Sequence, residues 1–453
     1  MMSSESPAGP GAAPVEPARV RKIWVAMSTP FQANFFAPLI KELRGEYEFV
    51  ITARDHDRIQ SILDAKKINY IPVGRHGGRD LSHKLEAYAE TIQKLLPIVK
   101  REKPDILLTE RWPEAVRTAF GLNIPSWTIF YDEREKHVNQ MVFPLATKVF
   151  TPRFYTFQEL YQNGVIDPDK VVWFNGFHTG YLKGAQLDEE NPYEKLHIDP
   201  PVVFVRPEPE FASFFSAHQL VLEKTVGLIQ KTGRASVAVL PRTASQERKY
   251  SKMGVYTLDE SMVESPVAHS DVAIGAAETM LMEAFILGKP AVSAIYWELS
   301  KPVIELHKYI PHSQDPGEIA RYVDDFLDAD QMKAFKEKAS LLVENMDNPV
   351  QLVVEEIRRL NIRKGEVALR RRSKMEIYID IIQAAALQPL RPTHMMKAAN
   401  ISYNELRVIV EALEAKGLIT VENTIGGKYY QATKDGLRLL QDYKTVHSRL
   451  FSS

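Results

Sequence analysis

Charged side chains follow several apolar segments of this chain, and their types suit acid–base chemistry or the binding of an anion. The stretch GRHGGRD, residues 74–80, combines glycines with Arg75, His76 and Arg79. Histidine can donate or accept a proton near neutral pH, and glycine allows a ligand to approach the backbone closely. His76 is therefore a candidate catalytic residue, and a turn with solvated charges is the alternative.

Two acidic residues also come directly after apolar segments. Glu110 follows DILLT, and Asp132 follows SWTIFY. A carboxylate in such a loop can act as a general acid or base. We predict catalytic roles for Glu110 and Asp132, and whether they lie within hydrogen-bonding distance of a partner depends on the fold.

Arg206 and Arg242 follow two later apolar segments, VVFV and SVAVLP. A guanidinium group so placed can stabilise negative charge that develops on a leaving group. An ordinary surface arginine is the alternative at both positions. No two histidines have the spacing of metal ligands, because His307 and His312 are too far apart for one helical face. His178 is expected to be a hydrogen-bonded loop histidine.

The composition restricts the chemistry further. The 453 residues include no cysteine, which excludes disulfides, thiolate metal sites and a cysteine nucleophile, and which suits a reducing compartment. No apolar run approaches the ~20 residues that span a bilayer, and residues 1–21, rich in Pro, Ala and Ser, predict a disordered tail. We expect a cytoplasmic protein with no membrane span, no metal and no cofactor.

Alternating apolar segments and helical patterns must position these residues. They predict an α/β fold with parallel sheets in two Rossmann-like lobes, residues 22–190 and 191–360. The first helix is expected at residues 33–44. Ligands of such sheets lie outside the carboxyl ends of the strands, so the candidate residues should surround a cleft between the lobes.

The C-terminal part has a different pattern. A basic linker, residues 361–372, leads to a segment, residues 373–453, with three helical patterns and then two strands around Gly-Gly. This order predicts a winged helix-turn-helix. Asn404, Arg407 and Lys428 are candidate DNA-binding residues. With ten Lys and Arg against eight Asp and Glu in this segment, a protein-binding or homodimerisation module is the alternative.

Residues 22–360 resemble an uncharacterised, largely archaeal family of GT-B architecture that is distantly similar to UDP-N-acetylglucosamine epimerases and MurG-type glycosyltransferases. The resemblance rests on STPFQANFFAPLIKEL, FVITARD, PEAVRTAFGLNIPS, VAVLPRTASQ and above all IGAAETMLMEAFILGKPAVS. The last segment resembles archaeal winged helices through AANISYNELRVIVEALEAKGLIT.

The resemblance implies a nucleotide-sugar, such as a UDP-sugar, bound mainly by the second lobe. Glu283 would accept the ribose hydroxyls, and the turn at Gly275 would present a helix start with Thr279 to the diphosphate. Arg206 and Arg242 would lie near the diphosphate. From the first lobe, the loop after the first strand would contribute Ser28 and Thr29.

The chain also departs from the pattern of that family. Ala277 and Glu278 stand where two glycines are usual, Met282 stands where an arginine is usual, and Arg111 and Trp112 are expected at the mouth of the cleft. Two hypotheses follow. The chain is a glycosyltransferase or epimerase-like enzyme, or it is a catalytically weakened ligand sensor that acts through the winged helix on DNA or on a protein.

Overall fold

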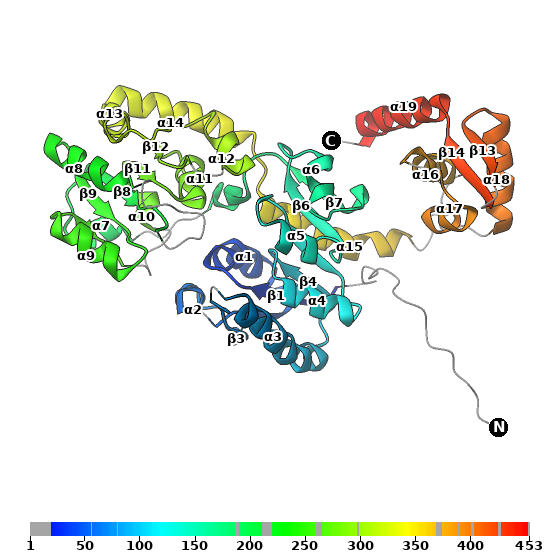
Figure 1. Cartoon of the computed structure of the whole chain (residues 1–453), viewed down its shortest axis with the longest axis horizontal. Coiled ribbons are helices and arrows are strands. Elements are labelled where there is room, and N and C mark those ends of the chain that lie inside the picture. The colour runs from blue at the N-terminus through cyan, green and yellow to red at the C-terminus, as the bar shows by residue number, and fades with distance from the viewer. Residues whose placement is uncertain are drawn as a thin grey trace. The chain divides into compact units, whose positions relative to one another are not determined.

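The computed structural model in Figure 1 divides the chain into two compact units, Met1–Lys364 and Gly365–Ser453. The structure describes residues 20–55, 57–78, 80–185, 190–210, 220–259, 265–296, 299–367, 374–387, 389–399, 403–424 and 427–451.

The first lobe is built on a parallel sheet of seven strands in the order β3-β2-β1-β4-β5-β6-β7. The strands are β1 (Lys22–Met27), β2 (Glu48–Ala53), β3 (Ile71–Pro72), β4 (Ile106–Thr109), β5 (Ser126–Ile129), β6 (Lys148–Pro152) and β7 (Val171–Phe174). The helices are α1 (Pro30–Leu43), α2 (Asp57–Ala65), α3 (Leu81–Glu102), α4 (Pro113–Gly121), α5 (Lys136–Val142) and α6 (Phe157–Gln162), with the 3-10 turns η1 (Pro168–Lys170) and η2 (His178–Leu182).

Both faces of this sheet are covered. Side chains of α1 and α2 pack on one face, and side chains of α3, α4 and α5 pack on the other. The central strands β1 and β4 are therefore almost wholly buried, as expected for a parallel sheet. The first helix begins at Pro30 rather than at residue 33, because the Thr29 side chain caps it and Pro30 suits the first helical position.

The second lobe has a parallel sheet of five strands in the order β10-β9-β8-β11-β12. The strands are β8 (Val202–Arg206), β9 (Ser236–Val239), β10 (Tyr256–Thr257), β11 (Val272–Gly275) and β12 (Ala291–Ser293). The helices are α7 (Pro192–Lys195), α8 (Leu222–Thr232), α9 (Ala244–Lys252), α10 (Ser265–His269), α11 (Glu278–Ile286), α12 (Lys301–Leu306), α13 (Pro316–Phe326) and α14 (Ala329–Glu344).

In each sheet the strand order reverses at one pair of neighbours. The first lobe reverses between β1 and β4, and the second between β8 and β11. The connections diverge to opposite faces at such a pair, which leaves a crevice at the carboxyl ends of the strands. Both crevices belong to the first unit of the chain.

The long helix α15 (Pro349–Val367) returns from the second lobe to the first. Its Glu356 accepts from Lys148 Nζ at 2.7 Å, and its Arg358 pairs with Glu42 at 3.0 Å. These contacts join the end of the body to strand β6 and helix α1.

The C-terminal unit has its own apolar core. It consists of α16 (Lys374–Leu387), α17 (Pro392–Ala399), α18 (Tyr403–Ala415), the antiparallel hairpin β13 (Ile419–Thr424) and β14 (Gly427–Ala432), and α19 (Lys434–Phe451). Leu390 forms an isolated antiparallel bridge with Tyr430 of the hairpin. In the described part of the chain, no helix is long and apolar enough to cross a bilayer.

Candidate functional site

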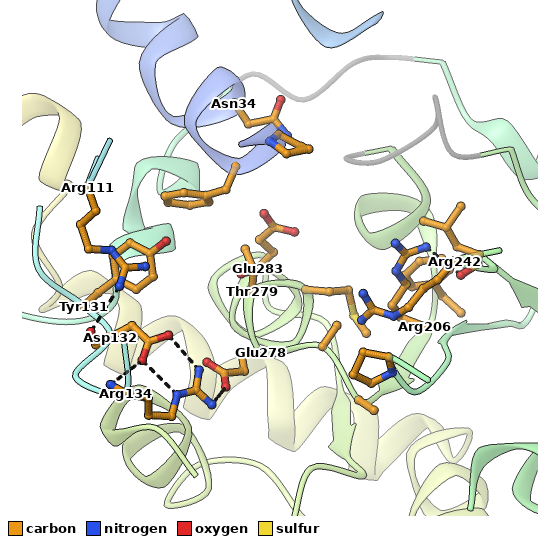
Figure 2. A pocket seen from close by; sticks show the side chains of 18 residues that line it. Asn34, Arg111, Tyr131, Asp132, Arg134, Arg206, Arg242, Glu278, Thr279 and Glu283 are labelled. Atoms are coloured by element: carbon orange, nitrogen blue, oxygen red, sulfur yellow. Dashed lines mark hydrogen bonds and ion pairs between the residues drawn. The ribbon is translucent and has the colours of Figure 1, made fainter. Parts of the chain in front are cut away.

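A cavity of about 410 Å³ lies where the carboxyl ends of the two sheets face each other. Figure 2 shows side chains from both lobes around it, with α11 of the second lobe in the middle. The lining residues come from the loops and helix starts after β1, β4, β5, β8, β9 and β11. They are Pro30, Phe31, Asn34, Arg111, Tyr131, Asp132, Arg134, Phe204, Arg206, Pro209, Leu240, Arg242, Ala276, Ala277, Glu278, Thr279, Met280 and Glu283.

Arg111 is held rigidly on the first-lobe wall. Its Nε donates to Glu110 Oε1 at 2.5 Å, and Gln32 Nε2 donates to the other oxygen of Glu110 at 2.6 Å. The Arg111 backbone has a φ of 41°, a left-handed conformation that is uncommon for a residue with a side chain. Glu110, only 3% exposed, is therefore the buried support of Arg111.

Arg111, Tyr131 and His178 form a group of stacked side chains, of which Arg111 and Tyr131 line the cavity. The Arg111 guanidinium lies 4.8 Å from the centre of the Tyr131 ring, and the Tyr131 ring stacks on His178 at 3.8 Å between ring centres. Among the described residues, neither ring nitrogen of His178 has a hydrogen-bond partner. Burial, together with the charge of Arg111, lowers the pKa of His178 to about 3, so the imidazole is neutral at physiological pH.

A chain of ion pairs connects the two lobes along one side of the cavity. Arg134 donates to both oxygens of Asp132 at 2.9 Å, and its Nη1 lies 2.6 Å from Glu278 Oε1 in the second lobe. Figure 2 shows Asp132, Arg134 and Glu278 in this sequence. Burial acts to raise the pKa of Asp132, but Arg134 outweighs it and holds this pKa below its usual range, whereas burial keeps the pKa of Glu278 raised.

The start of α11 forms the centre of the second-lobe wall. Its N-cap residue is Ala277, and no side chain caps the helix. Thr279 and Met280, in its first turn, line the cavity. The first backbone N–H groups of a helix lack partners within it and carry partial positive charge, so this helix start suits an anion.

Glu283 lies one turn further along α11 and is 7% exposed. It accepts a hydrogen bond from Tyr181 Oη at 3.3 Å. The carboxylate is thus fixed at the cavity by η2, and it is able to accept hydroxyl groups of a ligand.

Arg206 and Arg242 form the far side of the second-lobe wall. Arg206 donates to the carbonyls of Leu240 and Pro241 at 2.8 and 3.0 Å, and Arg242 Nε donates to the carbonyl of Pro207 at 2.9 Å. Both guanidinium groups therefore also brace the loops after β8 and β9.

The structure brings five of the predicted site residues together at the cavity: Asp132, Arg206, Arg242, Thr279 and Glu283. Gly275 lies just behind it, where a Cβ atom would be only 2.8 Å from the Arg206 carbonyl oxygen. Their roles remain predictions.

Other predicted site residues lie elsewhere. His76 is exposed on its loop, where its Nδ1 accepts from the Gly78 amide at 3.0 Å, and it does not line the cavity. Glu110 is behind Arg111, Thr29 caps α1, and the Ser28 Oγ atom accepts from Gln32 Nε2 at 3.3 Å. Arg79 lies outside the described residues.

Two sequence interpretations were wrong, and a third residue is simply buried. Trp112 is not at the mouth of the cleft, because it is fully buried in the core of the first lobe. Met282, which stands where an arginine is usual in the similar family, is also buried, on the face of α11 that packs into the core. His178 was expected to be hydrogen-bonded, and it is instead buried without a partner among the described residues.

Two cavity residues had no signal in the sequence. Asn34 is 4% exposed and lines the cavity, and its Oδ1 atom has no partner among the described residues. Arg134 bridges the lobes. Asn34 follows Ala33 inside an ordinary helical pattern, and Glu278, the second-lobe partner of Arg134, is 144 positions away, so only the tertiary structure reveals either residue.

The candidate DNA-binding residues belong to the second unit. Arg407 on α18 and Lys428 on β14 are exposed, and the side chain of Asn404 lies outside the described residues. Glu411 and Glu414 are exposed on the same helix as Arg407. The surface of α18 is therefore mixed in charge.

Comparisons with known proteins agree with this architecture. A Methanocaldococcus jannaschii protein, "Uncharacterized protein MJ0665", is 29% identical over 317 residues, which cover 67% of this chain and 91% of the relative. The S. aureus MnaA–UDP co-structure superposes with a TM-score of 0.58 at 18% identity, covering 74% of this chain and 96% of that one. UDP-GlcNAc 2-epimerase from Neisseria meningitidis bound to UDP-GlcNAc superposes with a TM-score of 0.56 at 16% identity. The match covers 75% of this chain and 100% of that one.

At these identities the likeness to solved structures shows the fold, which is an α/β GT-B architecture of two Rossmann-like lobes. A family model described as winged helix-turn-helix matches residues 371–450. Across residues 21–360 the chain matches, and therefore belongs to, the family described as protein of unknown function (DUF354).

Proposed function

We propose that this protein binds a nucleotide-activated sugar in the cavity between the lobes and acts as a glycosyltransferase or an epimerase-like enzyme. One observation carries the proposal. The uncapped start of α11 and the Glu283 carboxylate line the same 410 Å³ cavity, one turn apart. An anion on the helix start and hydroxyl groups on Glu283 would hold a phosphate and its ribose.

The position of the cavity supports the proposal independently. It lies at the carboxyl ends of both parallel sheets, where ligands of open α/β sheets bind. Its first-lobe wall adds the Arg111 guanidinium and the amide oxygen Asn34 Oδ1, which has no hydrogen-bond partner in the described part of the chain. These groups would face the sugar or its acceptor across from the nucleotide.

Asp132, the candidate acid–base residue that lines the cavity, is already paired with Arg134. Asp132 is held ionised by Arg134, so it is suited to accept a proton and unsuited to donate one. An enzymatic role for Asp132 therefore requires Arg134 to move or Asp132 to act as the base.

A binding screen tests the proposal. Uridine, cytidine, guanosine and thymidine nucleotides and their sugar conjugates are added at millimolar concentration, and the unfolding temperature is measured for wild type and Glu283→Ala. A ligand stabilises the folded state by RT ln(1 + [L]/Kd), so weak binding is detected. We expect a stabilising nucleotide whose effect is lost in Glu283→Ala. Tyr181→Phe, which removes the hydroxyl that donates to Glu283 and keeps the carboxylate, is the matched control. Stabilisation by no nucleotide rejects the proposal.

The winged helix supports a second candidate function, that of a ligand-sensing regulator. The observation that favours it is the pairing of Asp132 and Glu278 with Arg134, which leaves these acids bound to a cation.

DNA binding by Arg407 and Lys428 would then be measured by electrophoretic mobility as a function of salt. Each lost phosphate contact lowers the slope of log K against log salt by about 0.9. If Arg407→Ala and Lys428→Ala leave the slope unchanged, these residues bind no DNA, and a protein partner is the remaining alternative.

A further inference from the structure

The charges that line the cavity nearly cancel. Four arginines face three acids, and the fourth acid, Glu110, lies directly behind Arg111 at 2.5 Å. A diphosphate linkage brings one more negative charge than a monophosphate linkage, and the surplus positive charge of this cavity is small.

Glu278 occupies the most sensitive place in this arrangement. It is the first residue of α11, so its carboxylate shares the first turn with the amides of Thr279 and Met280. Any phosphate bound at those amides lies near this carboxylate. Repulsion between the Glu278 carboxylate and a bound phosphate is screened less in this partly buried wall than it would be in water.

Arg134 does not neutralise Glu278 fully, because it also binds both oxygens of Asp132. One guanidinium thus serves two carboxylates, and the Asp132–Arg134–Glu278 chain has a formal charge of −1. The other oxygen of Glu278 accepts from Ser300 Oγ at 3.0 Å, which fixes the side chain from a second direction. Arg206 and Arg242 are braced against backbone carbonyls on the far side of the same second-lobe wall.

We propose that Glu278 is a specificity-determining residue that admits one phosphate at the start of α11 and disfavours a second. The ligand is then a sugar joined to its nucleoside through a single phosphate. This inference rests on the proposed function, since it names the substrate class of the same cavity. Asn34 Oδ1 on the facing wall, which has no partner among the residues that the structure describes, is an additional acceptor for a donor group of that ligand.

The test is a calorimetric comparison of nucleoside monophosphates and diphosphates of uridine, cytidine, guanosine and thymidine. The measured quantity is the ratio of the two Kd values for each base in wild type, Glu278→Gln and Glu278→Asp. Glu247→Gln is the matched control, because Glu247 is an exposed first-turn acid of α9 that does not line the cavity. Unfolding temperatures without ligand establish that each variant is folded.

We expect wild type to bind the monophosphate at least as tightly as the diphosphate. In Glu278→Gln the ratio should shift toward the diphosphate by about tenfold, since the charge is lost, while Glu278→Asp and Glu247→Gln should keep it. The inference is overturned if wild type prefers the diphosphate, or if Glu278→Gln leaves the ratio unchanged. In both cases clear nucleotide binding leaves the proposed function standing, whereas no binding of any nucleotide rejects both.

Discussion

Two helices begin at the cavity, α1 in the first lobe and α11 in the second, and their starts differ. Helix α1 has a capping side chain, since Thr29 accepts from the Gln32 amide, and Pro30 has no N–H to satisfy. Helix α11 begins after Ala277, has no side-chain cap and carries Glu278 in its first turn. The start of α1 is thus capped by the protein itself, whereas the start of α11 has no side-chain cap and is where we propose that the ligand binds.

The residues around the two starts follow the same division. Near α1, Gln32 and Glu110 satisfy each other and hold Arg111 in place. Near α11, Thr279 and Glu283 face the cavity. Under the proposed function, the second-lobe wall would bind the part of the ligand with the strongest charge, and the first-lobe wall would support it.

The largest expected effect concerns the turn into α11. In Gly275→Ala the new Cβ would lie 2.8 Å from the Arg206 carbonyl oxygen and 2.6 Å from Met280 Cε. Because the backbone must shift, we expect a loss of about 1–3 kcal/mol in the free energy of unfolding, measured by urea denaturation. No glycine is needed after β1, where Ser28 occupies the turn.

Gly227→Ala provides the control for this change. Gly227 lies inside α8, and its new Cβ would come no closer than 3.9 Å, to Met253 Cε. We expect an unchanged or higher stability, by up to about 1 kcal/mol. Equal losses in the two variants would show that the turn at Gly275 has no special constraint.

The next effect concerns His178, in the segment η2 that contacts both α1 and α11. Its pKa of about 3 in the folded protein is below its ordinary value of 6.5, so the unfolded chain binds the proton more readily. The stability that depends on a neutral His178 is present above pH 6.5 and is lost as the pH falls toward 3. Between pH 7.5 and 5.5 we expect wild type to lose about 1.4 kcal/mol more than His178→Phe, as measured by urea denaturation at both values.

The phenylalanine in this variant keeps the stacking on Tyr131 and removes the titrating group. If the stability of the two proteins depends on pH in the same way, His178 acquires a proton in the folded state without a cost in stability. The burial of its imidazole would then not lower its pKa.

The smallest effects are expected from removing the side-chain cap of α1 and from adding one to α11. Thr29→Ala should cost about 1 kcal/mol of stability and leave nucleotide affinity unchanged. Ala277→Ser should add about 0.5–1 kcal/mol and weaken nucleotide binding about three- to tenfold, because the new hydroxyl accepts from an amide that the phosphate would use. Calorimetry and thermal unfolding measure both effects. Stronger nucleotide binding in Ala277→Ser would contradict the role of the uncapped start.

The sequence predicted the fold well, because strand and helix periodicity depends on local pattern. The resemblance to the GT-B family also placed Glu283 and Thr279 at the cavity, on the helix that follows β11. It missed Asn34 and Arg134, whose positions depend on how one lobe meets the other. His76 was misplaced for a related reason, because a glycine-rich loop has the composition of a binding site whether or not it reaches the cavity.

Trp112 shows a further limit of the same kind. It follows Arg111 in the sequence, but Arg111 adopts a left-handed backbone and lines the cavity while Trp112 is buried in the core. No periodic pattern in the sequence indicates that Arg111 adopts this backbone conformation, so the location of Trp112 could not be predicted.

Hydrogen exchange at the two helix starts is the most direct test of the central claim. The protein is saturated with the nucleotide or nucleotide-sugar that binds most tightly, and exchange is followed by mass spectrometry in peptides that cover residues 275–283 and 29–35. We predict slower exchange in the α11 peptide, whose first-turn amides have no side-chain cap, and an unchanged rate in the α1 peptide. Protection of α1 alone, or of neither helix while the ligand is bound, would contradict the assignment of the ligand to the start of α11.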